Sequence, residues 1–161
     1  MMYLLDTCIF RKLLDHFPRK GKQFEAIWLL IDKGIESKQL RSVDECLCEM
    51  QKHYSEESAN AKWLDERKSL FEYPNNEESL IIKDIFLFSK MRENIHLKNL
   101  LENRPSADVY LVAKGKRLQA TVVTAEEYKP NSAQLPNMCE QFNVRCIGFD
   151  DFMDEYLNGA I

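Results

Sequence analysis

Residues 2–6 read Met-Tyr-Leu-Leu-Asp, a short apolar run that ends on a carboxylate. An uninterrupted apolar run of this length is typical of a strand buried on both faces of a parallel sheet. Thr7 is expected to cap the following helix, residues 8–17, which Pro18 ends. Asp6 is therefore expected at the carboxyl end of a buried strand, directly before a helix.

Strands and helices alternate along the rest of the chain. Further strands are predicted at residues 39–43, 119–124 and 144–148, and helices at residues 24–34, 45–54, 107–116, 137–142 and 150–157. Asp44 is expected to cap the helix at 45–54, and Gly34 to end the helix at 24–34. This alternation predicts an α/β fold with a central, mainly parallel sheet, in a single domain over residues 1–161.

The segment 55–103 is expected to be helical and charged. Its clearest break is the sequence Pro-Asn-Asn at residues 74–76. Four apolar residues are expected to form a stripe that faces the core: Leu80, Ile81, Ile85 and Phe88.

Composition favours an ordinary folded protein. The chain has 161 residues, of which 45% are hydrophobic and 30% charged. Its seventeen aromatic residues argue against disorder. The longest apolar stretch, residues 24–31, is too short to span a bilayer, and no signal peptide precedes Asp6, so we expect a cytoplasmic protein. Five cysteines, an odd number lying within apolar patterns, predict buried thiols rather than a disulfide framework.

Charge is distributed unevenly along the chain. The formal net charge is −4, but residues 11–22 hold five basic residues and one acid, a local charge of +4 against −8 elsewhere. The basic residues are Arg11, Lys12, Arg19, Lys20 and Lys22. They could form a surface for a polyanion or simply a solvated helix end, and the charge pattern favours neither.

Acidic residues recur near the predicted strand ends. They are Asp6, Glu45 and Glu49 on the helix after the second strand, Asp108, and Glu126. Because parallel strands end at one edge, we expect Asp6, Glu49, Asp108 and Glu126 to converge, with at least three sharing one metal coordination shell. Taken singly, each acid is more simply a helix cap or a surface residue. Gathered together, they predict Mg²⁺ or Mn²⁺, because repelling carboxylates need a cation.

The order of these short motifs resembles the PIN-domain ribonuclease superfamily, in particular a bacterial PIN-like branch related to the VapC-type toxins. The resemblance spans nearly the whole chain. It lies in the motifs Leu4-Leu5-Asp6-Thr7, Ser42-Val43 with Glu49, Ala107-Asp108 with Val112-Ala113, residues 121–126 (Thr-Val-Val-Thr-Ala-Glu), and the segments 135–139 and 142–147.

The resemblance implies a three-layer PIN-like fold and a set of site residues. Catalytic, metal-binding roles fall to Asp6, Glu49, Asp108 and Glu126, with Thr7 and Thr124 supporting. We favour Glu49 as the second acid of this set, and Glu45 remains as its alternative or as a residue that assists it. Two positions depart from the pattern. Cys8 stands where such proteins often have Asn, which implies the loss of a polar group, and Glu126 stands where Asp is more usual.

The function implied is hydrolysis of RNA phosphodiester bonds by an Mg²⁺- or Mn²⁺-dependent endoribonuclease, with the basic residues 11–22 positioning the RNA backbone. The resemblance also implies a toxin with a partner antitoxin, and a homodimer; no membrane partner is expected. The alternative is a catalytically degenerate PIN-like module that binds RNA or protein. Haloacid-dehalogenase-type phosphotransfer is disfavoured, because Cys8 stands where that chemistry needs a second Asp.

Overall fold

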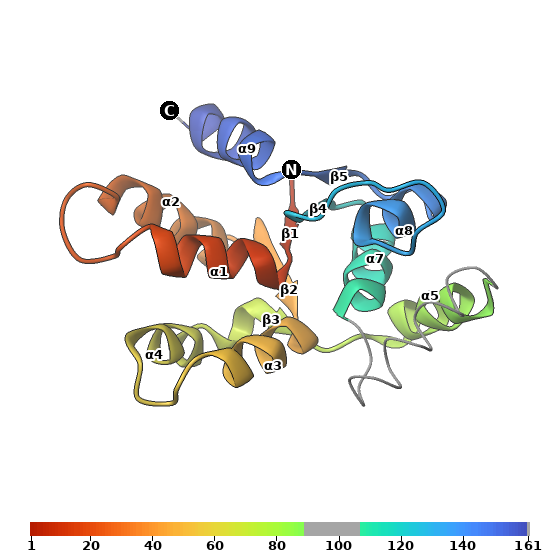
Figure 1. Cartoon of the computed structure of the whole chain (residues 1–161), viewed down its shortest axis with the longest axis horizontal. Coiled ribbons are helices and arrows are strands. Elements are labelled where there is room, and N and C mark those ends of the chain that lie inside the picture. Colours follow the sequence, from red (N-terminus) through yellow and green to blue (C-terminus); the bar gives the residue numbers. More distant parts are fainter. Residues whose placement is uncertain (89–106, 161) are drawn as a thin grey trace.

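The computed structural model describes residues 1–88 and 107–160, and in these ranges five strands form one sheet (Figure 1). The strands are β1 (Tyr3–Leu5), β2 (Leu40–Val43), β3 (Phe71–Glu72), β4 (Thr121–Val123) and β5 (Cys146–Ile147). They lie in the order β3-β2-β1-β4-β5, and each pairing is parallel. The predicted α/β fold with a mainly parallel sheet is confirmed.

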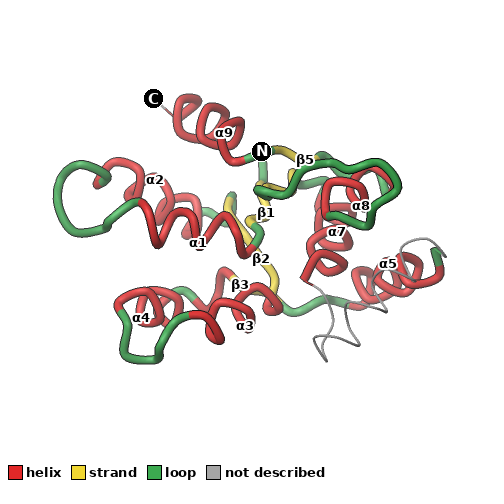
Figure 2. Tube along the Cα trace, viewed as in Figure 1, coloured by secondary structure: helices red, strands yellow, loops and turns green. Residues whose placement is uncertain are grey.

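Helices cover both sides of this sheet (Figure 2). They are α1 (Thr7–His16), α2 (Glu25–Glu36), α3 (Asp44–His53), α4 (Ala59–Glu66), α5 (Asn76–Leu87), α7 (Ala107–Leu118), α8 (Leu135–Gln141) and α9 (Phe149–Phe152), with the short turns η1 (Lys68–Leu70), η2 (Met153–Leu157) and η3 (Asn158–Ala160). α1 and α2 lie on one side of the strands and α7 and α8 on the other, which gives three layers. None of these described helices combines the length and apolar character that crossing a membrane requires.

Parallel pairing brings the carboxyl ends of the central strands to one edge. Leu5 of β1 pairs with Val123 of β4, so the next residue of each strand, Asp6 and Thr124, lies beside the other. β2 pairs with the opposite side of β1 and ends at Val43, directly before α3. Side chains that follow these three strands are therefore placed at a single edge.

The two central strands are buried on both faces. Leu4, Leu5, Val122 and Val123 are each at most 1% exposed. A strand that contacts helices on both faces needs apolar residues at every position, and this explains the unbroken apolar runs in the sequence.

Two helix starts differ from the prediction. Asp6 is the cap of α1, and its side chain accepts a hydrogen bond from the Thr7 amide, so Thr7 is the first helical residue. Asp44 does not cap α3 but begins it, because β2 passes into the helix without a loop and the extended Val43 (φ −117°, ψ 152°) holds the cap position. In both cases the strand ends where it was predicted to end, and the helix begins one residue earlier than predicted.

The segment after α3 is less helical than predicted, because β3 lies within it. A strand of two residues is too short to produce a recognisable pattern. Ile85 is fully buried, as predicted, and Ile81 and Phe88 are half-buried, but Leu80 is 65% exposed, so it does not face the core. The predictions for residues 89–106 lie outside the described residues.

Two more helix bounds and one cysteine require correction. α2 continues past Gly34 to Glu36. This glycine does not end the helix but allows close packing, since a Cβ there would lie 2.8 Å from the Leu40 side chain. The last predicted helix is α9 followed by the π-helical turn η2. All five cysteines are free thiols, and Cys48, unlike the others, is exposed because it lies on the outer face of α3.

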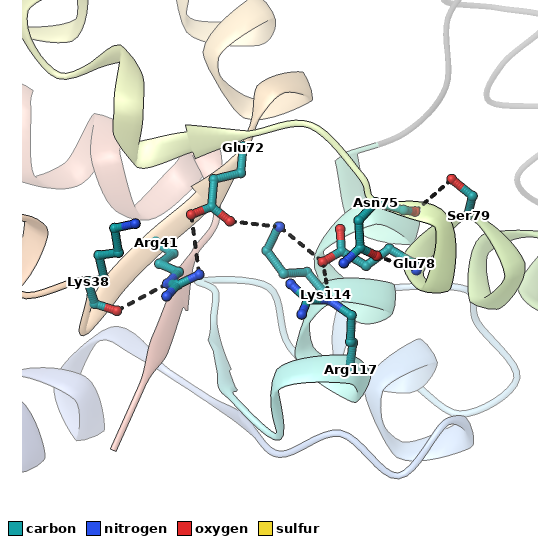
Figure 3. Close-up of polar contacts among 8 residues, drawn as sticks. All are labelled: Lys38, Arg41, Glu72, Asn75, Glu78, Ser79, Lys114 and Arg117. Carbon is teal, nitrogen blue, oxygen red and sulfur yellow. Dashed lines mark hydrogen bonds and ion pairs between the residues drawn. The ribbon is translucent and has the colours of Figure 1, made fainter.

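A network of buried ions ties the outer elements to α7 (Figure 3). Lys114 of α7 has a side chain only 2% exposed, and its Nζ lies 3.0 Å from Glu72 Oε2 and 3.1 Å from Glu78 Oε1. Arg117 Nε donates to the same Glu78 oxygen at 2.6 Å, and Arg41 Nη1 lies 3.3 Å from Glu72 Oε1. The network joins β2, β3, α5 and α7.

Replacing the central cation should destabilise the fold strongly. In Lys114→Met the buried Glu78 carboxylate loses its ammonium partner and keeps Arg117 as its cation, and breaking a buried ion pair costs about 3 to 5 kcal/mol. We expect this loss in the free energy of unfolding measured with urea. The double variant Lys114→Met/Glu78→Leu should recover most of the loss, because it removes both of the fully buried charges and leaves unpaired only Arg117, which is partly exposed.

The matched control is Lys68→Met, which removes a lysine whose ion pair with Asp65 is more than half exposed on both sides. An exposed pair contributes at most about 1 kcal/mol. A Lys114→Met variant no less stable than Lys68→Met would contradict a stabilising role for the buried network.

Candidate acidic site

Asp6 occupies the centre of the strand-end edge and is 6% exposed. Its Oδ1 accepts a hydrogen bond from the Thr7 amide at 2.7 Å. Its Oδ2 accepts hydrogen bonds from the Thr124 hydroxyl at 2.8 Å and from the Cys8 thiol at 3.0 Å. The carboxylate is therefore fixed in orientation by neighbours from α1 and from the end of β4.

The charge of Asp6 is poorly compensated. Burial raises the pKa of Asp6 above its ordinary value, and the nearby negative charge of Glu126 raises it further. The hydrogen bonds from Cys8, Thr124 and Thr7 lower this pKa, but they offset only part of the rise. A cation bound at this edge would favour the ionised form.

Glu49 reaches the neighbourhood of Asp6 through Thr7. The Thr7 hydroxyl donates to Glu49 Oε2 at 2.6 Å, which joins the first turn of α1 to the second turn of α3. Thr7 is thus a supporting residue for Glu49 and, through its backbone amide, for Asp6 as well.

Glu45 lies one turn earlier on α3, and its buried Oε2 has no hydrogen-bond partner among the described residues. Burial raises the pKa of Glu45; the charges of Asp44 and Glu49 add to the rise, and Lys114 opposes it. Glu45 therefore lies within electrostatic range of both Glu49 and the buried ion network. The hydrogen bond from Thr7, however, involves Glu49.

Glu126 follows β4 by three residues and performs a structural task. Its amide donates to Thr124 Oγ1 at 3.1 Å, and its Oε2 accepts from the Leu135 amide at 2.9 Å. α8 begins at Leu135, and Gln134, at the cap position, makes no side-chain capping bond. Glu126 therefore caps α8 while its charge acts on Asp6.

Asp108 lies in the first turn of α7 and is 7% exposed. Asp108 and Asp6 both lie within electrostatic range of the thiol of Cys139 on α8. A hydrogen bond with Cys146 and burial raise the pKa of Cys139 most, and the negative charges of Asp108 and Asp6 raise it further. Both carboxylates therefore act on one thiol.

Together these side chains form an acidic site of oxygen ligands, but not a preformed metal shell. In the described part of the chain, no three His, Cys, Asp or Glu side chains are spaced to hold a metal ion. That three carboxylates share one shell stays a prediction; in this structure Asp6, Glu49 and Glu126 each accept a hydrogen bond from a protein donor. The chemistry of these side chains fits a hard divalent cation, because all of them are carboxylates and the buried Oε2 of Glu45 has no hydrogen-bond partner in the part of the chain that the structure describes.

The structure divides the five basic residues into two groups. Arg11 and Lys12, on the exposed face of α1, line a surface hollow of about 230 Å³ together with Cys8, Asp15 and His16. Because Cys8 contacts Asp6, this hollow begins beside the acidic site. Lys12 also lies over the Phe149 ring, with 4.4 Å between Nζ and the ring centroid.

The Arg19 side chain is held by contacts within the protein. Its guanidinium donates to Asn60 Oδ1 and to the Ala59 carbonyl, each at 3.1 Å, and lies over the rings of Trp28 and Trp63. Lys20 and Lys22 are exposed in the connection between α1 and α2.

Cys8 is the site residue that the sequence reasoning misjudged. Instead of a missing polar group, the thiol donates to Asp6 Oδ2 and accepts from the Ala125 amide at 3.2 Å. Burial and the charge of Asp6 raise the pKa of Cys8 to about 12, so the sulfur keeps its proton as a donor. The sequence did carry a signal for this contact, because Cys8 lies in the first turn of a helix, two residues after the Asp that caps it.

Comparison with known proteins agrees with this architecture. A family model described as "Domain of unknown function (DUF4411)" matches residues 3–157. No curated protein matches the sequence. A chain of the crystal structure of VapBC2 from Rickettsia felis, bound to a DNA fragment from their promoter, matches with a TM-score of 0.54 and 15% identity, over 92% of this chain and 98% of that chain. At this identity the likeness concerns the fold alone, and it confirms the three-layer, PIN-like α/β fold.

Removing the Thr124 hydroxyl should change the pKa of Asp6, because this hydroxyl donates to the Asp6 carboxylate. A hydrogen bond to the ionised carboxylate lowers its pKa, so Thr124→Val should raise the pKa of Asp6 still further, with a stability loss of about 1 kcal/mol. We expect the shift in a carboxyl-carbon NMR titration of the protein in chelator.

Thr121→Val provides the matched control, since Thr121 is also buried on β4 but its hydroxyl accepts from Arg145. An Asp6 pKa that responds equally to both substitutions, or to neither, would show that the Thr124 hydrogen bond does not set it.

Proposed function

This protein belongs to the family described as Domain of unknown function (DUF4411), whose family model matches residues 3–157, and we propose that it is a metal-dependent endoribonuclease that hydrolyses RNA phosphodiester bonds. The observation that carries the proposal is the Asp6 carboxylate at the carboxyl edge of a parallel sheet, held by three donors and raised in pKa by its burial. Buried carboxylates with perturbed pKa values at such an edge are typical of functional sites.

In this proposal Asp6, Glu49, Asp108 and Glu126 hold Mg²⁺ or Mn²⁺. The bound cation would activate water and neutralise charge on the phosphate. The residues of the chain orient these acids: Thr124 and Thr7 donate to Asp6, and Thr7 also donates to Glu49. Glu45 assists Glu49 from the preceding turn.

Arg11 and Lys12 are the best placed of the basic residues to contact RNA. They line the hollow that begins at Cys8, so a bound phosphate backbone would pass from α1 toward Asp6. Lys20 and Lys22 extend this surface along the connection after α1. Arg19 contributes to it indirectly, because it holds that connection against α4.

The likeness of fold to VapBC2 supports a wider proposal. The chain is a single PIN-like domain over residues 1–161 and acts as a cytoplasmic toxin. An antitoxin would inhibit it by filling the acidic edge, and two copies would form a homodimer.

One observation favours a second candidate, a PIN-like module that binds RNA or protein without cleaving it. Glu126 accepts the Leu135 amide at the start of α8, a structural role that explains an acid at this position without any metal. The two candidates differ in whether Asp6 supports metal-dependent cleavage.

Asp6→Asn tests this difference. Because the pKa of Asp6 is raised, its ionised form costs folding free energy near neutral pH, and the neutral variant should be at least as stable as the parent in chelator. Mn²⁺ should raise the melting temperature of the parent more than that of the variant. We expect the parent, but not Asp6→Asn, to cleave pooled cellular RNA in Mn²⁺.

Asp151→Asn, at an exposed position on α9, is the control and should behave as the parent does. A parent that neither cleaves RNA nor responds to Mn²⁺, together with an Asp6→Asn variant destabilised by about 1 to 3 kcal/mol, would favour the binding module.

The RNA path is tested separately in chelator, so that the RNA stays intact. Arg11→Ala/Lys12→Ala should weaken binding of single-stranded RNA and lower the magnitude of its logarithmic salt slope by about 0.7 for each phosphate that the variant no longer neutralises. Fluorescence anisotropy at several salt concentrations measures both quantities.

Lys33→Ala/Lys83→Ala removes the same charge from exposed positions on α2 and α5 and should leave the salt slope unchanged. Equal losses in the two double variants would mean that net charge, rather than the α1 surface, governs binding.

A further inference from the structure

The Cys8 thiol contacts two segments that are far apart in the sequence. Its Sγ donates to Asp6 Oδ2 at 3.0 Å and accepts from the Ala125 amide at 3.2 Å. It also lies 3.5 Å from Thr124 Oγ1. One sulfur atom therefore joins the junction of β1 and α1 to the turn after β4.

The Thr124 hydroxyl makes the parallel connection. It donates to the same oxygen of Asp6 at 2.8 Å and accepts from the Glu126 amide at 3.1 Å. Two consecutive backbone amides, those of Ala125 and Glu126, are thus each bound to a side-chain atom that in turn binds Asp6 Oδ2. This arrangement fixes the turn that carries the Glu126 side chain relative to the Asp6 carboxylate.

We propose that Cys8 is a positioning residue of the acidic site, whose thiol sets the spacing between the Asp6 carboxylate and the turn carrying Glu126. This inference rests on the proposed function, because the spacing matters when both carboxylates bind one cation. Cys8 touches neither Glu126 nor substrate in this role; it acts through Asp6 and the Ala125 amide.

The role requires one atom that both donates and accepts a hydrogen bond. A thiol does both, and its long C–S bond extends its reach between the two segments. Serine keeps both capacities with a shorter bond, whereas alanine has neither. The pair Cys8→Ser and Cys8→Ala therefore separates hydrogen bonding from packing.

The test compares Cys8→Ala, Cys8→Ser and the control Cys48→Ala with the parent. Cys48 is an exposed cysteine whose thiol lies 3.6 Å from Asp44 Oδ2, so its removal also takes away a thiol beside a carboxylate. Three quantities are measured: the Mn²⁺ affinity by titration calorimetry, kcat and KM for RNA cleavage, and hydrogen exchange of the Ala125 amide by NMR.

Loss of a group that orients metal ligands typically lowers affinity or activity 10- to 100-fold. We expect Cys8→Ala to weaken Mn²⁺ binding and lower kcat by roughly this factor, with KM for RNA unchanged, and to speed exchange at Ala125. Cys8→Ser should recover most of these losses, and Cys48→Ala should match the parent.

Failure of the positioning role and failure of the proposed function give different results. If the parent binds Mn²⁺ and cleaves RNA while Cys8→Ala stays within about twofold of it, the positioning role is overturned and the nuclease proposal stands. A Cys8→Ser variant that is as impaired as Cys8→Ala would assign the effect to sulfur packing and overturn the hydrogen-bonded bridge. If the parent neither binds Mn²⁺ nor cleaves RNA, the proposed function fails and the inference fails with it.

Discussion

A single carboxylate buried at the end of the central strand is the constraint around which this edge of the protein is organised. Asp6 must follow β1 into α1 at a place where water is nearly excluded, and burial raises its pKa. Hydrogen-bond donors reach Asp6 from α1 and from the end of β4: the Thr7 amide, the Cys8 thiol and the Thr124 hydroxyl. Thr7 also donates to Glu49, and Cys8 and Thr124 also accept from amides of the turn after β4, so the groups that orient Asp6 also place Glu49 and the turn that carries Glu126.

The protein treats its two sets of buried charge differently. Around Lys114 the carboxylates of Glu72 and Glu78 face cations directly, as expected for charges that hold elements of a fold together. At the Asp6 edge, within the described residues, the carboxylate accepts hydrogen bonds from neutral donors and lies near the like charge of Glu126. Glu45 lies between these sets, influenced by Lys114 and by Glu49. A divalent cation would complete the acidic edge as Lys114 completes the network.

The sequence was most informative where burial alone determines the pattern. β1 and β4 are buried throughout because both faces are covered, and all of their residues but Thr121 are apolar, so their ends locate Asp6 and Thr124. It was least informative where a role depends on partners far along the chain: the sulfur of Cys8 contacts residues 124–125, and Glu126 caps a helix nine residues later. The buried Lys114 gave no local signal at all, since its partners lie on other elements.

Anomalous scattering from crystals grown with Mn²⁺ would test the central claim most directly, because it locates the metal without reference to activity. We expect a manganese peak at the carboxyl edge of the sheet, with Asp6 as a ligand and with Glu49, Asp108 and Glu126 turned toward the ion. Crystals of the intact chain with no peak at this edge, or with Glu126 bound to the Leu135 amide and Asp6 to its three donors around an empty site, would contradict it.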